Sequence, residues 1–239
     1  ISLMGKKLNL PFFLSPTALQ RIFHHEGEMA VGKAAEKFNT FFGISSLSTV
    51  SASEIGKLAT PKIFQLYSHK DKELTKSMID KCKDENFDAL ALTVDTITGG
   101  NRERDLRSGF TSPPQFNLKS ILSYMTSPSW TLNYLLGKKF DLPFLSDYVG
   151  EGTNFAISVS DYFSTMLDQK MNWSDAENIR KYWNGPFCLK GIMSAEDAKN
   201  AVKIGASAIM ISNHGGRQLD GSRSPFDQLK EILDNVGGQ

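Results

Sequence analysis

The chain has 239 residues, with 27 Lys and Arg against 26 Asp and Glu, 40% hydrophobic and 22% charged residues. This is the composition of an ordinary globular protein, and it excludes disordered, collagen-like and coiled-coil chains. A net charge of +1 gives no reason to expect a nucleic-acid partner. The only two cysteines, Cys82 and Cys188, are far apart, which argues against a disulfide framework and fits a reducing, cytoplasmic compartment.

The two ends of the chain suggest that it is part of a longer protein. The first residue is Ile1 instead of Met, and the last residues, 236–239, stop where a helix would lead to its next element. No basic-then-apolar leader opens the chain, and no apolar run approaches the roughly 18 residues of a membrane-spanning helix.

Short apolar runs alternate with amphipathic segments along the chain. Six runs have the length and the nearly continuous apolar character of strands buried on both faces. They are residues 10–14, 41–45, 62–67, 89–94, 187–190 and 208–212. Helical spacing of apolar residues predicts helices at 28–37, 71–86 and 195–204, with Gly205 ending the last of these. Repeated β-then-α order predicts an α/β fold.

The ends of these strands favour a barrel over an open sheet. Polar residues follow every strand: Ser15, Thr17, Ser45, Gln65, Tyr67, Thr93, Asp95, Lys190, Ser212, Asn213 and His214. Such groups converge on one face when parallel strands form a ring, and the sequence lacks the Gly-x-Gly-x-x-Gly of a dinucleotide-binding sheet. We therefore expect a (β/α)8 TIM barrel, truncated to about six βα units and forming one domain over residues 1–239.

A long excursion interrupts this rhythm after the fourth strand, at about residues 99–174. It is rich in proline and glycine but also carries apolar islands around Trp130 and Phe144. Such an excursion is typical of an active-site cover or a partner surface, with a structureless insertion as the alternative. The apolar, lysine-flanked stretch 130–144 could also lie in a bilayer interface and pass electrons to a quinone, or pack on the barrel as a lid.

The most informative motif is residues 212–220, Ser-Asn-His-Gly-Gly-Arg-Gln-Leu-Asp. A glycine-bearing turn after a buried strand can direct His214 and Arg217 into one cavity. Histidine suits proton abstraction near neutral pH, and arginine offers two parallel donors to a carboxylate. The alternative is a histidine that caps a helix and an arginine that is solvated.

This motif closely resembles the signature of the FMN-dependent α-hydroxy acid dehydrogenase and oxidase family. Further matching segments follow in family order: 15–18 (Ser-Pro-Thr-Ala), 64–67 (Phe-Gln-Leu-Tyr), 92–95 (Leu-Thr-Val-Asp), 102–105 (Arg-Glu-Arg-Asp) and 189–191 (Leu-Lys-Gly). Arg104-Asp105 followed by Ser108-Gly109 looks closest to the bacterial membrane-associated L-lactate dehydrogenases. The resemblance implies a flavoenzyme that oxidises an L-2-hydroxy acid, with L-lactate favoured.

The resemblance also implies a site for FMN at the mouth of the barrel. The matching positions that contact the cofactor are Pro16, Thr17, Ala18, Ser45, Gln65, Thr93, Lys190 and Ser212. Lys190 resembles the lysine near flavin N1 and O2, where a cation stabilises the reduced ring. Because Lys190 interrupts a buried run, a surface position is a poor alternative for it, whereas Gln65 and Thr93 could also satisfy backbone groups at strand ends.

For the substrate, His214 resembles the base that takes the C2-hydroxyl proton, and Asp95 its carboxylate partner. Arg217 and Arg102 resemble the arginines that hold the substrate carboxylate, and Tyr67 the tyrosine that hydrogen-bonds to the substrate. Asp95 could instead cap a helix, and Tyr67 could simply pack at the rim.

The remaining histidines predict no catalytic or metal-binding role. We expect His24 and His25 to be structural or to line the barrel mouth. His24 and His25 precede a helix start, and adjacent histidines on a helix cannot share a metal, so we expect no metal site. His69 lies in a charged stretch, which predicts a solvated side chain.

Three expectations concern the whole protein. In the family resembled, two further strands that bind the FMN phosphate would follow residue 239, so we expect this polypeptide alone to bind FMN weakly or not at all. We expect the full-length protein to be a homo-oligomer, cytoplasmic or peripheral on the inner membrane. An oxidase that passes electrons to oxygen and an inactive barrel fragment that serves as a binding module remain as alternative functions.

Overall fold

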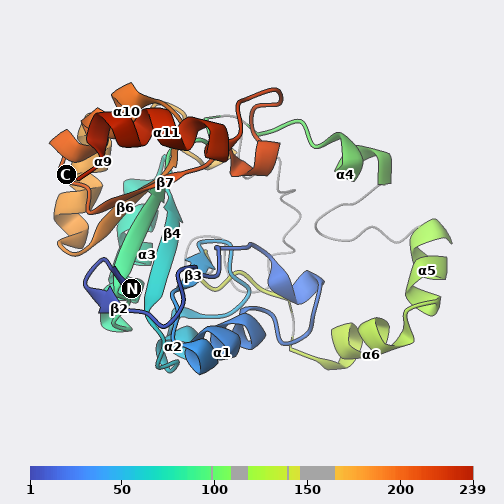
Figure 1. Cartoon of the computed structure of the whole chain (residues 1–239). Helices are drawn as coiled ribbons and strands as arrows, with labels where there is room; N and C mark the ends of the chain where they lie inside the picture. Colours follow the sequence, from blue (N-terminus) through green and yellow to red (C-terminus); the bar gives the residue numbers. More distant parts are fainter. Residues whose placement is uncertain (98, 109–117, 139, 146–164, 239) are drawn as a thin grey trace.

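A computed structural model describes residues 1–97, 99–108, 118–138, 140–145 and 165–238. Within these residues one sheet contains five parallel strands, which pair in chain order (Figure 1). They are β3 (Phe42–Ser45), β4 (Lys62–Tyr67), β5 (Ala89–Thr93), β6 (Phe187–Ile192) and β7 (Ala208–Ile211). A doubly wound sheet would reverse its strand order, whereas consecutive parallel strands form the wall of a (β/α) barrel. The α/β barrel class expected from the sequence is confirmed.

Helices connect the strands and cover the outer face of the sheet. They are α1 (Glu28–Phe38), α2 (Ala52–Gly56), α3 (Lys72–Asp84), α9 (Trp173–Trp183), α10 (Ala195–Lys203) and α11 (Pro225–Val236). Figure 1 shows α9, α10 and α11 beside β6 and β7, with α1 and α2 near β3. Side-chain caps start the connecting helices: Asp71 accepts the backbone N–H of Leu74, and Ser194 that of Asp197. The helices expected at 28–37, 71–86 and 195–204 are confirmed within two residues.

Alternate residues of each strand face opposite sides of the sheet. Phe64, Leu66 and Leu90 belong to the core between the sheet and the helices. Ile63, Ala91 and Cys188 belong to a second, smaller cluster on the other face, where Leu8 joins them. Two residues farther along each strand, the inner-facing positions become polar, and this change from apolar to polar marks the mouth of the barrel.

The strand expected at 10–14 is wrong in extent. Only Leu14 makes a β-bridge, to Phe42, and the backbone N–H of Gly43 donates to the Leu14 carbonyl at 2.7 Å. Pro11 and Pro16 lack the N–H that a longer ladder needs. Ahead of this segment, Ser2–Leu3 (β1) pairs with Lys6–Lys7 (β2) in a short hairpin that the apolar pattern does not predict.

The described parts of the excursion are anchored on the barrel. They contain α4 (Glu103–Ser108), α5 (Leu118–Met125) and α6 (Pro128–Leu136), with α5 and α6 drawn apart from the sheet in Figure 1. The Trp130 indole N–H donates to the Ile22 carbonyl at 2.9 Å. Phe144 is buried against Phe64, with ring centroids 4.7 Å apart. Among the residues described, no helix is long and apolar enough to cross a membrane.

Candidate active site at the barrel mouth

The predicted site residues lie at the carboxyl ends of five neighbouring strands. Register places Ser45 beside Gln65, Tyr67 beside Thr93, and Thr93 beside Lys190. Ser212 follows β7 directly. Since parallel strands end at one rim, the fold gathers residues that are far apart in sequence.

Ser45, Gln65 and Thr93 form a hydrogen-bonded row across three strands. The Ser45 hydroxyl donates to Gln65 Oε1 at 3.2 Å, and Gln65 Nε2 donates to Thr93 Oγ1 at 2.7 Å. All three side chains are at most 3% exposed. In this row the side chains hydrogen-bond to one another across neighbouring strands. Their role is therefore not limited to satisfying backbone groups at the strand ends. The row forms a polar edge at the barrel mouth.

Lys190 places a cation beside this row. Its Nζ donates weakly to Ser212 Oγ at 3.5 Å, and the described residues bring no carboxylate within ion-pair distance of it. Burial lowers the pKa of Lys190, whereas the charge of Asp95 raises it. A half-buried ammonium group whose hydrogen-bond partner among the described residues is a distant hydroxyl is suited to an anionic or acceptor group of a ligand.

His214 and Asp95 form a direct pair. His214 Nδ1 lies 2.9 Å from Asp95 Oδ1, with side chains 18% and 13% exposed. An ionised carboxylate only accepts, so the bond places the histidine proton on Nδ1 and leaves Nε2 as the basic nitrogen. Asp95 Oδ2 is buried and has no hydrogen-bond partner among the described residues. Asp95 is thus placed to orient the imidazole.

The turn that carries His214 is held by hydrogen bonds from its backbone to neighbouring side chains. This turn, η2 (His214–Gly216), has positive φ at His214, Gly215 and Gly216, of 59°, 68° and 71°. Asn213 accepts the Gly216 N–H at 3.2 Å, and Ser212 Oγ accepts the His214 N–H at 3.1 Å. Consecutive left-handed residues are unfavourable except at glycine, so Gly215 and Gly216 make the turn possible.

The two predicted arginines come from adjacent loops. Gly100 lies so near the turn that a Cβ atom there would be 1.7 Å from the Arg217 carbonyl oxygen. Arg102 is half-buried, whereas Arg217 is exposed. Burial raises the pKa of the Tyr67 hydroxyl, the Asp95 charge raises it further, and Arg102 opposes both. Tyr67, Asp95 and Arg102 are thus within electrostatic reach of one another.

The segment 16–18, which precedes the first strand of the sheet, reaches the same rim. A Cβ at Gly43 would be 2.7 Å from the backbone nitrogen of Pro16, so this segment lies directly against β3. Ala18 packs partly on the core, and Thr17 lines a cavity. Their backbone is thereby positioned beside Ser45 and its neighbours.

Gly191 allows Asp95 to pack closely against β6. It belongs to the 189–191 motif, but the sequence alone does not reveal this role. Its φ is +107°, and a Cβ there would be 2.7 Å from Asp95 Cβ. Only glycine combines this conformation with such a close approach. The irregular pairing between Lys190 and Ile192 lies at the same point. A glycine directly after a lysine at a strand end is the signal that could have indicated it.

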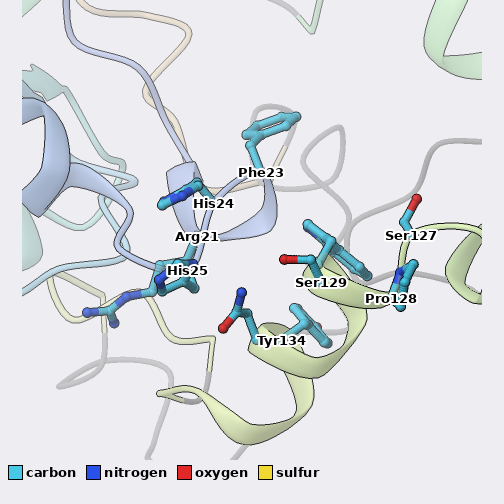
Figure 2. A pocket seen from close by; sticks show the side chains of 10 residues that line it. Arg21, Phe23, His24, His25, Ser127, Pro128, Ser129 and Tyr134 are labelled. Atoms are coloured by element: carbon cyan, nitrogen blue, oxygen red, sulfur yellow. The ribbon is translucent and has the colours of Figure 1, made fainter.

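Two cavities lie next to the turn that follows η1 (Gln20–Ile22), and Thr17 of the predicted site lines one of them. The first, of about 440 Å³, lies between that turn and α6; Figure 2 shows Phe23 and His24 facing Ser129 and Tyr134 across it. The second, of about 480 Å³, is lined by Ser15, Thr17, Phe23 and His24. Phe23 and His24 therefore separate two neighbouring spaces, one of which reaches the 15–18 segment.

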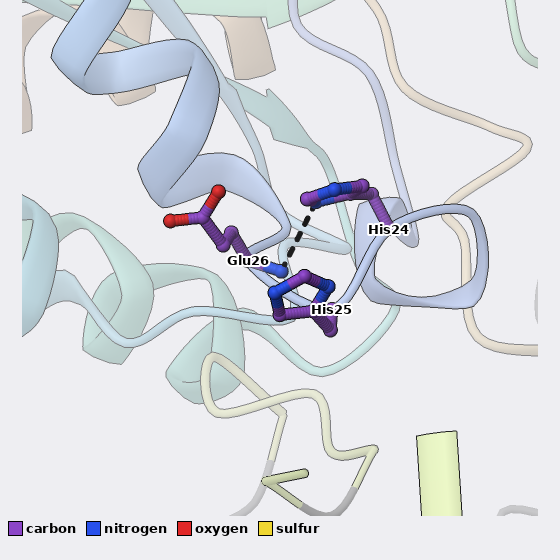
Figure 3. Close-up of side chains that lie close together, drawn as sticks. All are labelled: His24, His25 and Glu26. Atoms are coloured by element: carbon purple, nitrogen blue, oxygen red, sulfur yellow. Dashed lines mark hydrogen bonds between the residues drawn. The ribbon is translucent and has the colours of Figure 1, made fainter. Parts of the chain in front are cut away.

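His24, His25 and Glu26 lie in a turn before α1 and not within the helix (Figure 3). The helical objection to a shared metal therefore does not apply, and one ligand atom of each residue lies within 4.8 Å of the others. All three side chains are exposed, and His24 Nδ1 accepts the Glu26 N–H at 3.3 Å. The absence of a metal site stays a prediction.

The expectation that His69 is solvated is wrong. Its side chain is fully buried, and it forms an antiparallel bridge with Leu167. Burial lowers its pKa to about 4. The segment that covers His69, residues 165–168, lies almost a hundred residues downstream. The charge pattern around His69 in the sequence therefore could not reveal that the side chain is buried.

The chain matches the family described as FMN-dependent dehydrogenase over residues 1–239. It is 39% identical over 238 residues to an L-lactate dehydrogenase of Vibrio parahaemolyticus, covering 99% of this chain and 62% of that protein. An L-lactate dehydrogenase of Pseudomonas syringae is 38% identical over 237 residues, with 98% and 62% covered. The chain thus spans about 62% of the length of these relatives.

Solved structures agree with this assignment. The monotopic membrane protein (S)-mandelate dehydrogenase superposes with a TM-score of 0.89 at 29% identity, covering 99% of this chain and 63% of that one. A lactate oxidase of Pediococcus acidilactici has a TM-score of 0.80 at 29% identity, with 100% and 57% covered. From the match along its entire length, the chain belongs to the FMN-dependent dehydrogenase family.

Proposed function

We propose that the protein containing this chain oxidises an L-2-hydroxy acid, with L-lactate as the preferred substrate, to the 2-oxo acid. The observation that carries the proposal is the 2.9 Å contact between His214 Nδ1 and Asp95 Oδ1 at the barrel mouth. Relatives named L-lactate dehydrogenase support the choice of substrate.

The rim residues fit FMN. Lys190 is a half-buried cation that can serve an acceptor group, and the Ser45–Gln65–Thr93 row offers a polar edge. These side chains, with Ser212 and the 16–18 backbone, would hold the flavin ring and its ribityl chain. When bound, FMN supplies a two-electron acceptor for the substrate.

The remaining residues act on the hydroxy acid. His214 Nε2 takes the C2-hydroxyl proton, and Asp95 stabilises the imidazolium that forms. Arg217 and Arg102 bind the substrate carboxylate, and Tyr67 hydrogen-bonds to the substrate. A carboxylate held at two points orients the C2 carbon, and orientation of this kind lowers the barrier substantially.

Anaerobic mixing of the FMN-loaded whole protein with L-lactate tests the assignment. The flavin absorbance of the wild type should bleach, whereas His214→Gln should keep its FMN and bleach at least 100-fold more slowly, because general-base catalysis contributes about 10²–10⁴-fold. Arg217→Gln should mainly raise KM, and Arg223→Gln, an exposed arginine on the following loop, serves as its control. Normal bleaching by His214→Gln would refute the role of this base.

An oxidase is the second candidate, favoured by similarity to structures named lactate oxidase and mandelate oxidase, the latter 33% identical with a TM-score of 0.78. Peroxide formed per L-lactate consumed under air separates the two: a yield near one supports the oxidase, and a yield near zero supports the dehydrogenase.

Peripheral membrane association forms a further part of the proposal. Leu132, Leu135 and Leu136 of α6 are 57%, 71% and 82% exposed, and the adjacent α5 exposes Leu122 and Met125. Large exposed apolar groups at helical spacing form a surface suited to a bilayer interface. We call these five residues the α5–α6 apolar face. The similar (S)-mandelate dehydrogenase is itself named a monotopic membrane protein.

Vesicle sedimentation tests this surface. Leu135→Glu with Leu136→Glu should release the protein from vesicles of mixed anionic and neutral lipid. The matched control is Phe226→Glu, which changes an 83% exposed apolar residue on α11. Equal binding by both variants would show that the α5–α6 apolar face does not contact the bilayer.

A further inference from the structure

Three potential metal ligands lie together in the turn that precedes α1. One ligand atom each of His24, His25 and Glu26 lies within 4.8 Å of the other two (Figure 3). The two imidazole rings are close, with centroids 4.4 Å apart and planes inclined by 32°. Successive residues of a helix point in different directions, and for this reason the sequence predicts no metal site here. That objection does not hold in a turn, where the backbone brings the two rings together.

Buried contacts hold the turn in this shape. Gly27, at its end, has a φ of +55°, and its N–H donates to the His24 carbonyl at 2.9 Å. The next residue, Glu28, is fully buried and accepts the backbone N–H groups of Gln20 and Thr49 at 3.3 and 3.0 Å. The three potential ligands nevertheless have exposed side chains. Little backbone freedom is therefore lost when an ion binds them.

The three side chains are available to a cation. Among the residues that the structure describes, His24, His25 and Glu26 form no ion pair. His24 Nδ1 accepts the Glu26 N–H at 3.3 Å, which is a long hydrogen bond. A metal must replace this bond, by taking Nδ1 itself or by taking Nε2 after the ring proton moves to Nδ1. The loss of one exposed hydrogen bond is small beside the gain of two metal–imidazole bonds.

The turn also has space beside it for an ion and its water. His24 lines both cavities, of about 440 and 480 Å³, and His25 lines the first. Across the first cavity, α6 contributes the neutral hydroxyl of Ser129, which can contact water on the ion (Figure 2). Arg21 lines this cavity too, and its Nη1 donates to the Thr49 carbonyl at 2.7 Å. An ion at the turn would therefore keep an open coordination position toward the cavity.

We propose that His24, His25 and Glu26 bind one zinc ion, with water as the fourth ligand. Imidazole nitrogens and a carboxylate oxygen are ligands that Zn²⁺ takes in proteins, at about 2.0–2.2 Å. Ligand atoms on a tetrahedral ion of this size lie about 3.3–3.6 Å apart, and exposed side chains can rotate to close the remaining gap. The ion fixes the wall that the two cavities share. Neither FMN nor the hydroxy acid is needed for this binding.

Calorimetric titration of the untagged whole protein with Zn²⁺ tests the site. The wild type should bind one ion per chain, and His24→Gln and His25→Gln should each raise Kd at least tenfold. Glu26→Gln should raise Kd by a smaller factor, because an oxygen ligand remains but its charge is lost. The matched control is Glu196→Gln, which removes an exposed carboxylate on α10 and should keep Kd within twofold of the wild type.

A further variant separates this site from the proposed active site. His214 is a partly exposed histidine beside a carboxylate and is the main competitor for Zn²⁺. His214→Gln should keep the wild-type Kd for Zn²⁺, whatever it does to the oxidation of a hydroxy acid. Wild-type affinity in both His24→Gln and His25→Gln, loss of binding in His214→Gln, or no saturable binding by the wild type would overturn the proposal.

Anomalous scattering from zinc-soaked crystals locates the ion directly. One peak should lie within bonding distance of His24, His25 and Glu26, at about 2.0–2.2 Å from each ligand atom. A zinc peak elsewhere on the chain, with none at this turn, would contradict the assignment.

Discussion

His214 Nδ1 lies 2.9 Å from Asp95 Oδ1, although 119 residues separate the two in the sequence. The bond defines which ring nitrogen is basic and places an anion where a positive charge would develop. Asp95→Asn keeps the size of the side chain but removes that charge, so we expect kcat to fall by about 10²–10⁴-fold. Asp220→Asn, on the exposed loop that follows, is the matched control for steady-state turnover. A normal kcat in Asp95→Asn would mean that the carboxylate only orients the ring.

Lys190 should control the reduction potential of the bound flavin. Lys190→Met removes a half-buried cation that would stabilise the reduced ring, so the potential should become more negative. A charge-assisted hydrogen bond contributes about 1.5–3 kcal/mol, which for two electrons corresponds to roughly 30–60 mV. Potentiometric titration measures the shift, and Lys203→Met, at the exposed end of α10, provides the baseline. An unchanged potential in Lys190→Met would place this lysine outside the reach of the flavin.

His69 predicts a pH dependence of stability. Its pKa is lowered to about 4 from 6.5, so between these pH values the unfolded state binds more protons than the folded state. The free energy of unfolding should therefore decrease as the pH falls from about 6.5 toward 4, by on the order of 3 kcal/mol in full. Above pH 7 this residue should contribute no slope.

Denaturant titrations at pH 7.5, 6.5, 5.5 and 4.5 would reveal the effect. His69→Gln should flatten the profile, whereas His25→Gln, which changes an exposed histidine, should leave it steep. Parallel profiles for wild type and His69→Gln would assign the acid sensitivity to other groups.

Phe144 should stabilise the whole barrel although it lies in the long excursion. Its ring is 1% exposed and stacks on Phe64. Phe144→Ala should lower the free energy of unfolding by about 3–5 kcal/mol, the usual cost of truncating a buried aromatic residue. Leu135→Ala, at a position that is 71% exposed, should change it by less than about 0.5 kcal/mol. Chemical denaturation compares the two, and similar small losses would mean that residues 140–145 are not part of the core.

The sequence predicts best those features that depend on local pattern. Residues 62–67 and 89–94 form mostly apolar runs, which predict strands. The bounds of β4 and β5 agree with these predictions to within one residue. The strand pattern predicts only that Asp95 and His214 lie at one rim, where the ends of buried parallel strands meet. That the two form a pair is implied by the resemblance to the family.

Features that depend on distant segments could not be predicted in the same way. Residues 10–14 are apolar, but the prolines in and after them limit pairing to a single bridge. His69 is surrounded by charged residues in sequence, yet the 165–168 segment covers it. The bond that fixes α6, from Trp130 to the Ile22 carbonyl, joins residues 108 positions apart, and no periodicity encodes it.

The consecutive pairing of β3 to β7 has a consequence for the order of folding. Strands β3, β4 and β5 are close in sequence and can pair soon after they leave the ribosome. The pairing of β5 with β6 must first close the loop formed by the long excursion, and such distant contacts form slowly. Because His214 follows β7, it meets Asp95 only when the last of these strands has joined the sheet. We therefore expect the Asp95–His214 pair to form late in refolding, after the burial of Phe64 and Leu90 in the earlier strands.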